Sequence, residues 1–162
     1  MDELIAALKT YDWGGDRGAL AGIDQRIVDA RGAKKELADI EQALLEVLQS
    51  DAKLPAKEYI CRQLALIGSD RSVPVLSEML IDPALSDCAR MALEAIPDPS
   101  AGKALRRALD KADGVQRVGI VNALGERRDR KSIPMLSKMR NSPDSTLSAA
   151  ADAALRKIEA GN

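Results

Sequence analysis

The sequence predicts an all-α protein built as a stack of antiparallel helix pairs, a solenoid. The first reason is an internal repeat: residues 72–79 (SVPVLSEM) return 60 residues later as residues 132–139 (SIPMLSKM), with five of eight positions identical. Self-similarity at a fixed offset is the sequence signature of repeat architectures. The second reason is composition, because aromatic residues make up only 2% of the chain. The core must therefore consist mainly of aliphatic side chains, among which Leu and Ala are strong helix formers.

Aligned leucines define the length of the repeat. Four of them recur at intervals of 29, 31 and 31 residues: Leu64, Leu93, Leu124 and Leu155. Each of the first three is followed 12 residues later by another: Leu76, Leu105 and Leu136. The distance inside a unit is constant and only the distance between units varies, so insertions fall in loops and each unit holds two helices. The offset of 60 is thus two periods of about 30.

Turn-forming residues mark where the helices begin and end. Clusters of Gly, Pro, Asp and Ser, such as residues 68–70 and 97–100, separate runs in which apolar residues lie three and four apart. This spacing is typical of amphipathic helices, and Asp, Ser and Pro favour their first turns. We expect about ten helices, over residues 3–10, 16–31, 33–49, 54–67, 72–81, 84–96, 100–112, 115–126, 131–141 and 144–160.

The chain is interpreted as one domain over residues 1–162, because this length suits a single hydrophobic core. Residues 51–160 carry the repeat, whereas residues 1–50 keep the helical pattern and lose the period. Terminal units of a solenoid cover the end of the core and are commonly atypical. We therefore expect residues 1–50 to form capping helices, with Trp13 packed on the first repeat.

A longer pattern surrounds the leucines. The pattern is a run of the form Ala-Leu-Gly-x-Ile-Gly-Asp followed by a helix with Val-Pro-x-Leu. Parts of it occur at residues 64–76, 92–105, 123–136 and 154–158. Over about residues 45–160 this resembles the short HEAT-like repeats of the phycobilisome-lyase type. Residues 8–14 (LKTYDWG) are similar to the start of larger bacterial HEAT-repeat proteins of unassigned role. The resemblance implies a right-handed α-solenoid, a HEAT-like superhelix of about ten helices.

The third copy departs from that pattern. Arg127 and Arg128 stand where the family has Ile-Gly, which predicts a longer, basic loop. The arginine that the family places seven residues before the leucine is matched only by Arg117. Lyase activity belongs to a few members of the family, and no motif here carries it over, since fold does not imply function.

Catalytic chemistry is poorly represented in the chain. Histidine, the commonest general base and metal ligand, is absent. Gly-rich phosphate loops of standard spacing are missing too. Cys61 and Cys88 have no cysteine or histidine close in sequence, and free Cys is usually a buried small hydrophobe. We expect two reduced, buried thiols, no cofactor, no bound metal and no enzymatic activity.

The second helix of each unit is expected to line the concave face, because the resemblance implies that arrangement. Residues two, five and six positions before the aligned leucine should point away from the core. Among them, the candidate protein-binding residues are Tyr59, Arg62, Cys88, Met91 and Asn122. Tyr, Met and Arg are enriched in protein interfaces, which makes Tyr59 the expected anchor and Arg62 the expected contact to an acidic group. The alternatives are contact with a second copy of the chain and an ordinary solvated surface.

Charge is distributed unevenly along the chain. Residues 1–100 hold 11 Lys/Arg against 18 Asp/Glu, a net of −7, whereas residues 101–162 hold 13 against 7, a net of +6. Much of the basic half comes from Arg106, Arg107, Arg127, Arg128, Arg130 and Lys131. Such asymmetry can mark nucleic-acid or membrane contact, although no aromatic residues lie among these cations to stack on bases. An acidic partner, head-to-tail association or solvated helix faces explain the asymmetry equally well.

The leading hypothesis is a non-catalytic scaffold that binds a protein or peptide partner on its concave face. The alternatives are nucleic-acid binding through the basic C-terminal loops and, third, an accessory protein of the lyase type. The sequence contains neither a signal-peptide pattern nor an apolar run long enough to span a membrane, so a cytoplasmic location is the default expectation. A trimmed leader would leave the same sequence. The partner's identity and the oligomeric state do not follow from the residues.

Overall fold

The computed structural model describes residues 1–160, which contain ten α-helices, one short 3-10 helix and no strand. The expectation of an all-α protein is confirmed. The helices are α1 (Asp2–Thr10), α2 (Gly18–Asp29), α3 (Lys34–Leu48), α4 (Leu54–Ile67), α5 (Ser72–Met79), α6 (Ser86–Ala95), α7 (Pro99–Ala108), α8 (Gly114–Glu126), the 3-10 helix η1 (Arg130–Ser132), α9 (Ile133–Met139) and α10 (Ser145–Glu159).

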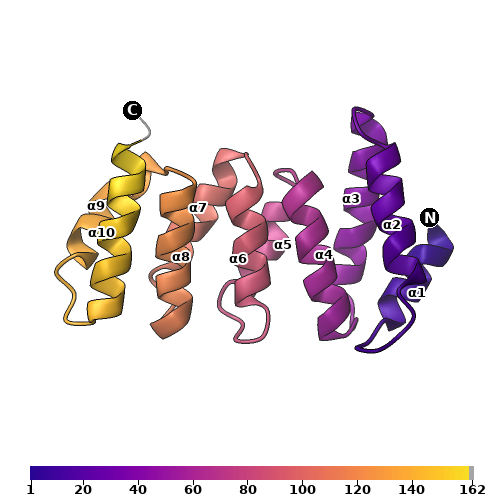
Figure 1. Ribbon diagram of the computed structural model, residues 1–162, viewed down its shortest axis with the longest axis horizontal. Helices are drawn as coiled ribbons and strands as arrows, with labels where there is room; N and C mark the ends of the chain where they lie inside the picture. Colours follow the sequence, from indigo (N-terminus) through magenta and orange to yellow (C-terminus); the bar gives the residue numbers. More distant parts are fainter. Residues whose placement is uncertain (161–162) are drawn as a thin grey trace.

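The helices lie in two layers that follow one another along the long axis of the molecule (Figure 1). Helices α2, α4, α6, α8 and α10 form what we call the front layer, and α3, α5, α7 and α9 form the back layer. Within the front layer α4 packs on α6, α6 on α8, and α8 on α10; α5 and α7 pack on each other in the back layer. The two termini lie at opposite ends of the row.

The repeated leucines account for the core. Leu64, Leu93 and Leu124 in the front layer are fully buried, and Leu155 is 5% exposed. Their counterparts in the back layer are buried as well: Leu45, Leu76, Leu105 and Leu136. One continuous apolar cluster runs from Leu8 in α1 to Ile158 in α10. The repeat therefore records the positions where each helix pair buries its shared apolar side, which is the main stabilising contribution in a stack of helices.

Several helices are shorter than expected. The back-layer helix α7 ends at Ala108 rather than at residue 112, and α5 ends at Met79 rather than at residue 81. Before α9 the chain forms η1, where the Asp129 carboxylate accepts the backbone N–H of Lys131. Asp98 and Asp144 accept backbone N–H groups at the starts of α7 and α10, which is the role expected of Asp at a helix N-terminus.

The expectation for Trp13 is wrong, since its side chain is 70% exposed. The loop that carries it is anchored through Asp12, whose carboxylate pairs with Lys53 Nζ at 2.5 Å. A turn follows with Gly14 at a φ of 77°, and the indole is left in solvent. Leu8 of α1, which is fully buried, supplies the apolar contact at this end instead.

Candidate functional site

The residues two positions before three of the front-layer leucines, Leu64, Leu93 and Leu124, lie on an exposed row. Arg62 on α4, Met91 on α6 and Asn122 on α8 are all exposed, Met91 to 51%. Leu66, four residues after Arg62 on α4, is 74% exposed. Large apolar side chains at the surface of a helix layer are candidates for contact with another molecule.

Tyr59 is not on this row, which corrects the expectation that it points away from the core. The side chain is 4% exposed, and its hydroxyl contacts the carbonyl oxygen of Leu20 at 3.0 Å and the Asp24 carboxylate at 2.7 Å. Burial and the adjacent carboxylate raise the pKa of Tyr59 above its ordinary value. Positions two and five before the leucine differ by about 60° around a helix, and α2 covers the side of α4 that bears Tyr59. Tyr59 ties α4 to α2 and is no anchor for a partner.

The two cysteines come together, although they are far apart in sequence. Cys61 on α4 is buried and Cys88 on α6 is half-buried; both are free thiols. The proximity of the two thiols raises the pKa of Cys61 and lowers that of Cys88. The Cys88 thiol donates to the carbonyl oxygen of Leu85 at 3.1 Å. Cys88 thus lies at the α4–α6 contact and only its edge reaches the surface.

A groove runs between α6 and α8 next to the exposed row. Its volume is about 780 Å³, and its lining combines apolar side chains with both signs of charge. Val115, in the first turn of α8, is 89% exposed there, and Ile81 is 48% exposed. Neither residue is among the binding candidates that the sequence predicts, because the leucine spacing does not report the exposure of side chains at helix ends. The lining residues are Leu80, Ile81, Pro83, Ser86, Asp87, Arg90, Lys111, Asp113, Val115, Gln116, Val118, Gly119, Ile120 and Asn122.

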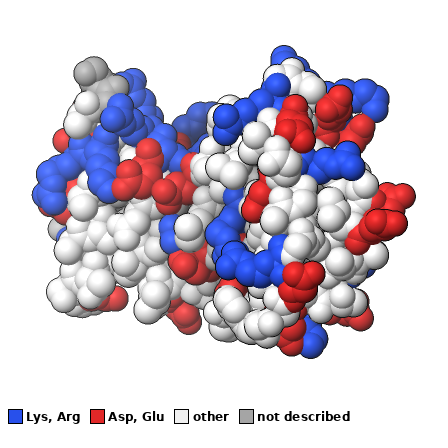
Figure 2. Space-filling model, turned by 45° about the vertical axis from the view of Figure 1, so that its right-hand side comes forward, with Lys and Arg blue, Asp and Glu red and all other residues white. Residues whose placement is uncertain are grey.

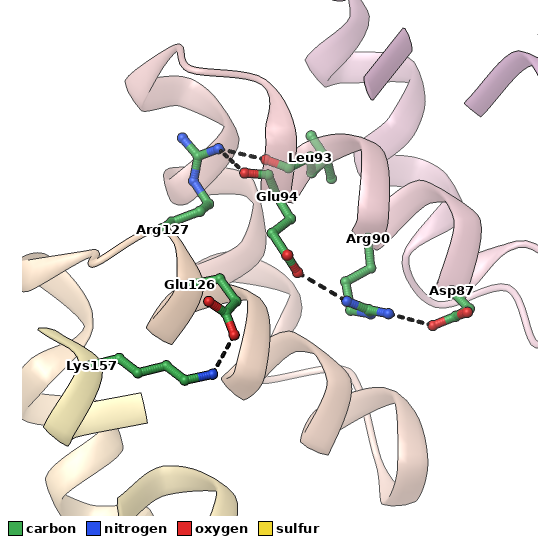
Figure 3. A network of polar contacts seen from close by, with 7 residues as sticks. All are labelled: Asp87, Arg90, Leu93, Glu94, Glu126, Arg127 and Lys157. Carbon is green, nitrogen blue, oxygen red and sulfur yellow. Dashed lines mark hydrogen bonds and ion pairs between the residues drawn. The ribbon is translucent and has the colours of Figure 1, made fainter. Parts of the chain in front are cut away.

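Arg90 forms the wall of the groove between the two helices. Its guanidinium pairs with Asp87 at 2.6 Å and with Glu94 at 3.1 Å, both on α6 (Figure 3). The side chain lies flat across α8 at Gly119, where an added Cβ would be 3.1 Å from Arg90 Cδ. Because its charge is balanced on its own helix, Arg90 shapes the groove without giving it a net positive charge.

The six cations predicted as a basic patch divide into different roles. Arg106 forms an ion pair with Asp129, and Arg107 lies in a different groove, between α5 and α7. Arg127 donates to the carbonyl oxygens of Leu93 at 2.7 Å and Glu94 at 3.0 Å (Figure 3). It also donates to the carbonyl oxygens of Asp98 at 3.0 Å and of Ile96. Burial lowers the pKa of Arg127. The remaining three, Arg128, Arg130 and Lys131, are exposed.

Charge on the surface follows the asymmetry of the sequence. Figure 2 shows Lys and Arg gathered over the upper left, at the end formed by the C-terminal helices, and Asp and Glu frequent toward the right-hand edge. At the C-terminal end Lys157 pairs with Glu126 across α10 and α8 (Figure 3). Some of the cations of the basic half are therefore paired with carboxylates.

No cluster of three or more potential metal ligands occurs among residues 1–160. Within the same range, no helix is both long and apolar enough to cross a membrane. No protein-family model matches the chain, and no curated protein sequence matches it. A function must therefore be argued from the grooves, the exposed side chains and the charges described above.

Proposed function

We propose that the protein is a non-catalytic scaffold, a right-handed α-solenoid of HEAT-like repeats, whose front layer binds a protein or peptide partner. The observation that carries this proposal is the α6–α8 groove together with three exposed apolar side chains on the front layer. Leu66, Met91 and Val115 are 74%, 51% and 89% exposed, each on a different helix. Val115 lines the groove, and Leu66 and Met91 lie on the front layer outside its lining. Exposed apolar side chains on the same layer as a groove are candidates for contact with a protein partner.

The polar residues around the groove support a peptide rather than a small molecule as the partner. Asp87 and Asp113 lie along the groove with Lys111, and Asn122 supplies an amide at its edge. Such a mixed lining offers hydrogen bonds to a peptide backbone while the apolar side chains contact alternate residues of the partner. Arg62, exposed on α4, extends the surface toward the N-terminal half. Binding energy would come mainly from Met91 and Val115, since a few buried anchors usually dominate an interface.

The partner face is tested by capture from the source cell with paired variants. Val115→Glu places a charge in the groove and Met91→Glu places one on the exposed row of the front layer. Ile133→Glu places one on α9 in the back layer, where Ile133 is 37% exposed. We expect at least one protein to be captured by the wild type and by Ile133→Glu and to be lost with both front-layer variants. Capture of the same set of proteins by all four would refute the proposed face. Circular dichroism of each variant checks that the helices remain.

A further inference from the structure

The end of α8 contains an unusual backbone conformation. The N–H of Asp129 donates to Leu124 O at 3.0 Å and that of Arg128 to Gly125 O at 3.0 Å, a pair of bonds that closes a helix with one residue in the left-handed region. Here that residue is Arg128, at a φ of 51°, the single non-glycine residue with positive φ among residues 1–160. Gly14, Gly32 and Gly114 fill the other such positions. Glycine is the usual choice because an L side chain is strained there.

Arg106 and Arg127 have structural partners for their guanidinium groups, whereas the Arg128 side chain has no ion-pair partner among residues 1–160. Arg106 is paired with Asp129, and Arg127 is hydrogen-bonded to carbonyl oxygens at the end of α6. By contrast, Arg128, Arg130 and Lys131 are exposed and form no ion pair with any side chain in the described part of the chain. Their side chains contribute nothing visible to the fold, so an arginine in a strained position needs another explanation. Strained residues that the fold does not require are often functional.

These cations surround a hollow between α7 and the α8–α9 loop. Its volume is about 290 Å³, and no aromatic side chain lines it. The floor is rigid, because Asp129 is held by Arg106 and a Cβ added at Gly102 would lie 3.0 Å from Asp129 Oδ2. The residues around the hollow are Pro99, Gly102, Arg106, Arg127, Arg128, Asp129, Arg130 and Lys131.

We propose that the α8–α9 loop is a second binding site, in which Arg128, Arg130 and Lys131 bind an acidic peptide segment of a partner protein. Three cations within four residues, on a fixed loop, match a short run of carboxylates, and guanidinium groups bind carboxylates through paired hydrogen bonds. This site does not depend on the front-layer groove.

The surroundings favour a peptide over a nucleic acid. Tyr11, Trp13 and Tyr59, all the aromatic residues of the chain, belong to its first 60 residues, so none stands beside the loop to stack on bases. The whole chain carries a net charge of −1, unlike the strongly basic balance of most nucleic-acid-binding domains.

The test measures fluorescence anisotropy of a labelled oligoglutamate peptide at low and at physiological salt. The variant that removes the cations is Arg128→Gln with Arg130→Gln and Lys131→Gln. A matched control removes three exposed cations at the other end of the chain: Arg26→Gln with Arg31→Gln and Lys34→Gln. We expect the first variant to bind about tenfold more weakly than wild type. The control should bind like wild type, although it carries the same change in net charge.

Arg128→Gly separates binding from folding. It relieves the left-handed strain, so we expect a higher melting temperature together with weaker binding of oligoglutamate. A purely structural role for Arg128 would not produce that combination. The proposal is overturned if oligoglutamate binds no better than oligoglutamine, or if the control variant weakens binding as much as the loop variant. Tighter, loop-dependent binding of single-stranded or duplex oligonucleotides would also overturn it, in favour of a nucleic-acid surface.

Discussion

Two equivalent helix ends in the front layer are covered in different ways. The end of α4 is covered by Ile96, which approaches so closely that a Cβ added at Gly68 would lie 2.9 Å from Ile96 Cδ1. The end of α6 is covered by the residue at the same position one unit later, Arg127, through hydrogen bonds to backbone carbonyls. The last carbonyl groups of a helix lack partners within the helix and attract cations. The contact at the end of α4, which we call the apolar joint, is thus made by Ile96. The contact at the end of α6, which we call the guanidinium joint, is made by Arg127.

The same contrast extends to the back layer. Ahead of α5, the buried Glu41 of α3 accepts hydrogen bonds from Ser69 N at 2.7 Å and from Ser72 Oγ at 2.6 Å. Ahead of α9 the polarity is reversed, because Arg106 of α7 supplies the positive charge and Asp129 of the loop the carboxylate. The fold accepts either arrangement as long as the buried polar groups have partners. The charge that a back-layer helix contributes to the following loop can therefore be negative, as at Glu41, or positive, as at Arg106.

The apolar joint should be the more sensitive of the two. Ile96 is 1% exposed, so Ile96→Ala leaves a cavity between the ends of α4 and α6. We expect the free energy of unfolding to fall by about 3 kcal/mol, measured by urea denaturation. Ile81→Ala, at a residue that is 48% exposed, should change it by less than about 0.5 kcal/mol. Equal effects of the two substitutions would show that Ile96 does not hold the joint.

Removing the guanidinium should have the next largest effect. Arg127→Ala leaves the carbonyl groups of Leu93, Glu94 and Asp98 without their donors. We expect a loss of about 2 kcal/mol in the free energy of unfolding, because hydrogen bonds from a charged donor contribute more than neutral ones. Arg107→Ala, which removes an exposed arginine from α7, serves as the control and should have little effect. An Arg127→Ala protein as stable as the control would mean that solvent replaces these bonds at no cost.

A smaller effect, of opposite sign, is expected at Arg128. Arg128→Gly removes the strain of a side chain at a φ of 51° and should raise the free energy of unfolding by about 1 kcal/mol. The reverse change tests the same physics elsewhere: Gly32 has a φ of 85° with open space around it, so Gly32→Ala should lower stability by about 1 kcal/mol. Both values come from thermal or urea unfolding. If Gly32→Ala destabilises and Arg128→Gly does not stabilise, the Arg128 side chain makes compensating contacts.

The helices could be predicted from the sequence because periodic leucines and turn residues act locally. The ends of α5 and α7 could not, since two or three residues at a helix C-terminus depend on packing with the next helix. The expected exposure of the Tyr59 side chain is wrong for a related reason. Its exposure depends on α2, which lies outside the repeat, and no regularity of the later units reports where α2 packs.

The basic character of the α8–α9 loop follows from the sequence, whereas its internal organisation does not. Arg127 and Arg128 are adjacent in sequence, yet one donates to helix-end carbonyls and the other faces solvent. Only the left-handed turn at Arg128 separates them, and a pattern of residue types does not reveal such a turn when glycine is absent. The exposure of Val115 was missed in the same way, because it depends on how α8 is rotated against α6.

The pH dependence of Asp98 gives the smallest expected effect on the guanidinium joint. The Ser100 hydroxyl and backbone N–H donate to its carboxylate, and Arg127 lies nearby; together they lower the pKa of Asp98 from 3.8. A group with a lower pKa in the folded state binds fewer protons there than in the unfolded chain. Its stabilising contribution is therefore complete above pH 3.8 and is lost as the pH falls through the folded-state pKa.

Asp98→Asn keeps the capping acceptor and removes the titration, so its melting temperature should fall less steeply with acid than that of wild type. Asp110→Asn, at an exposed aspartate beyond α7, should keep the wild-type slope. Identical slopes for all three proteins would place the acid sensitivity outside this joint.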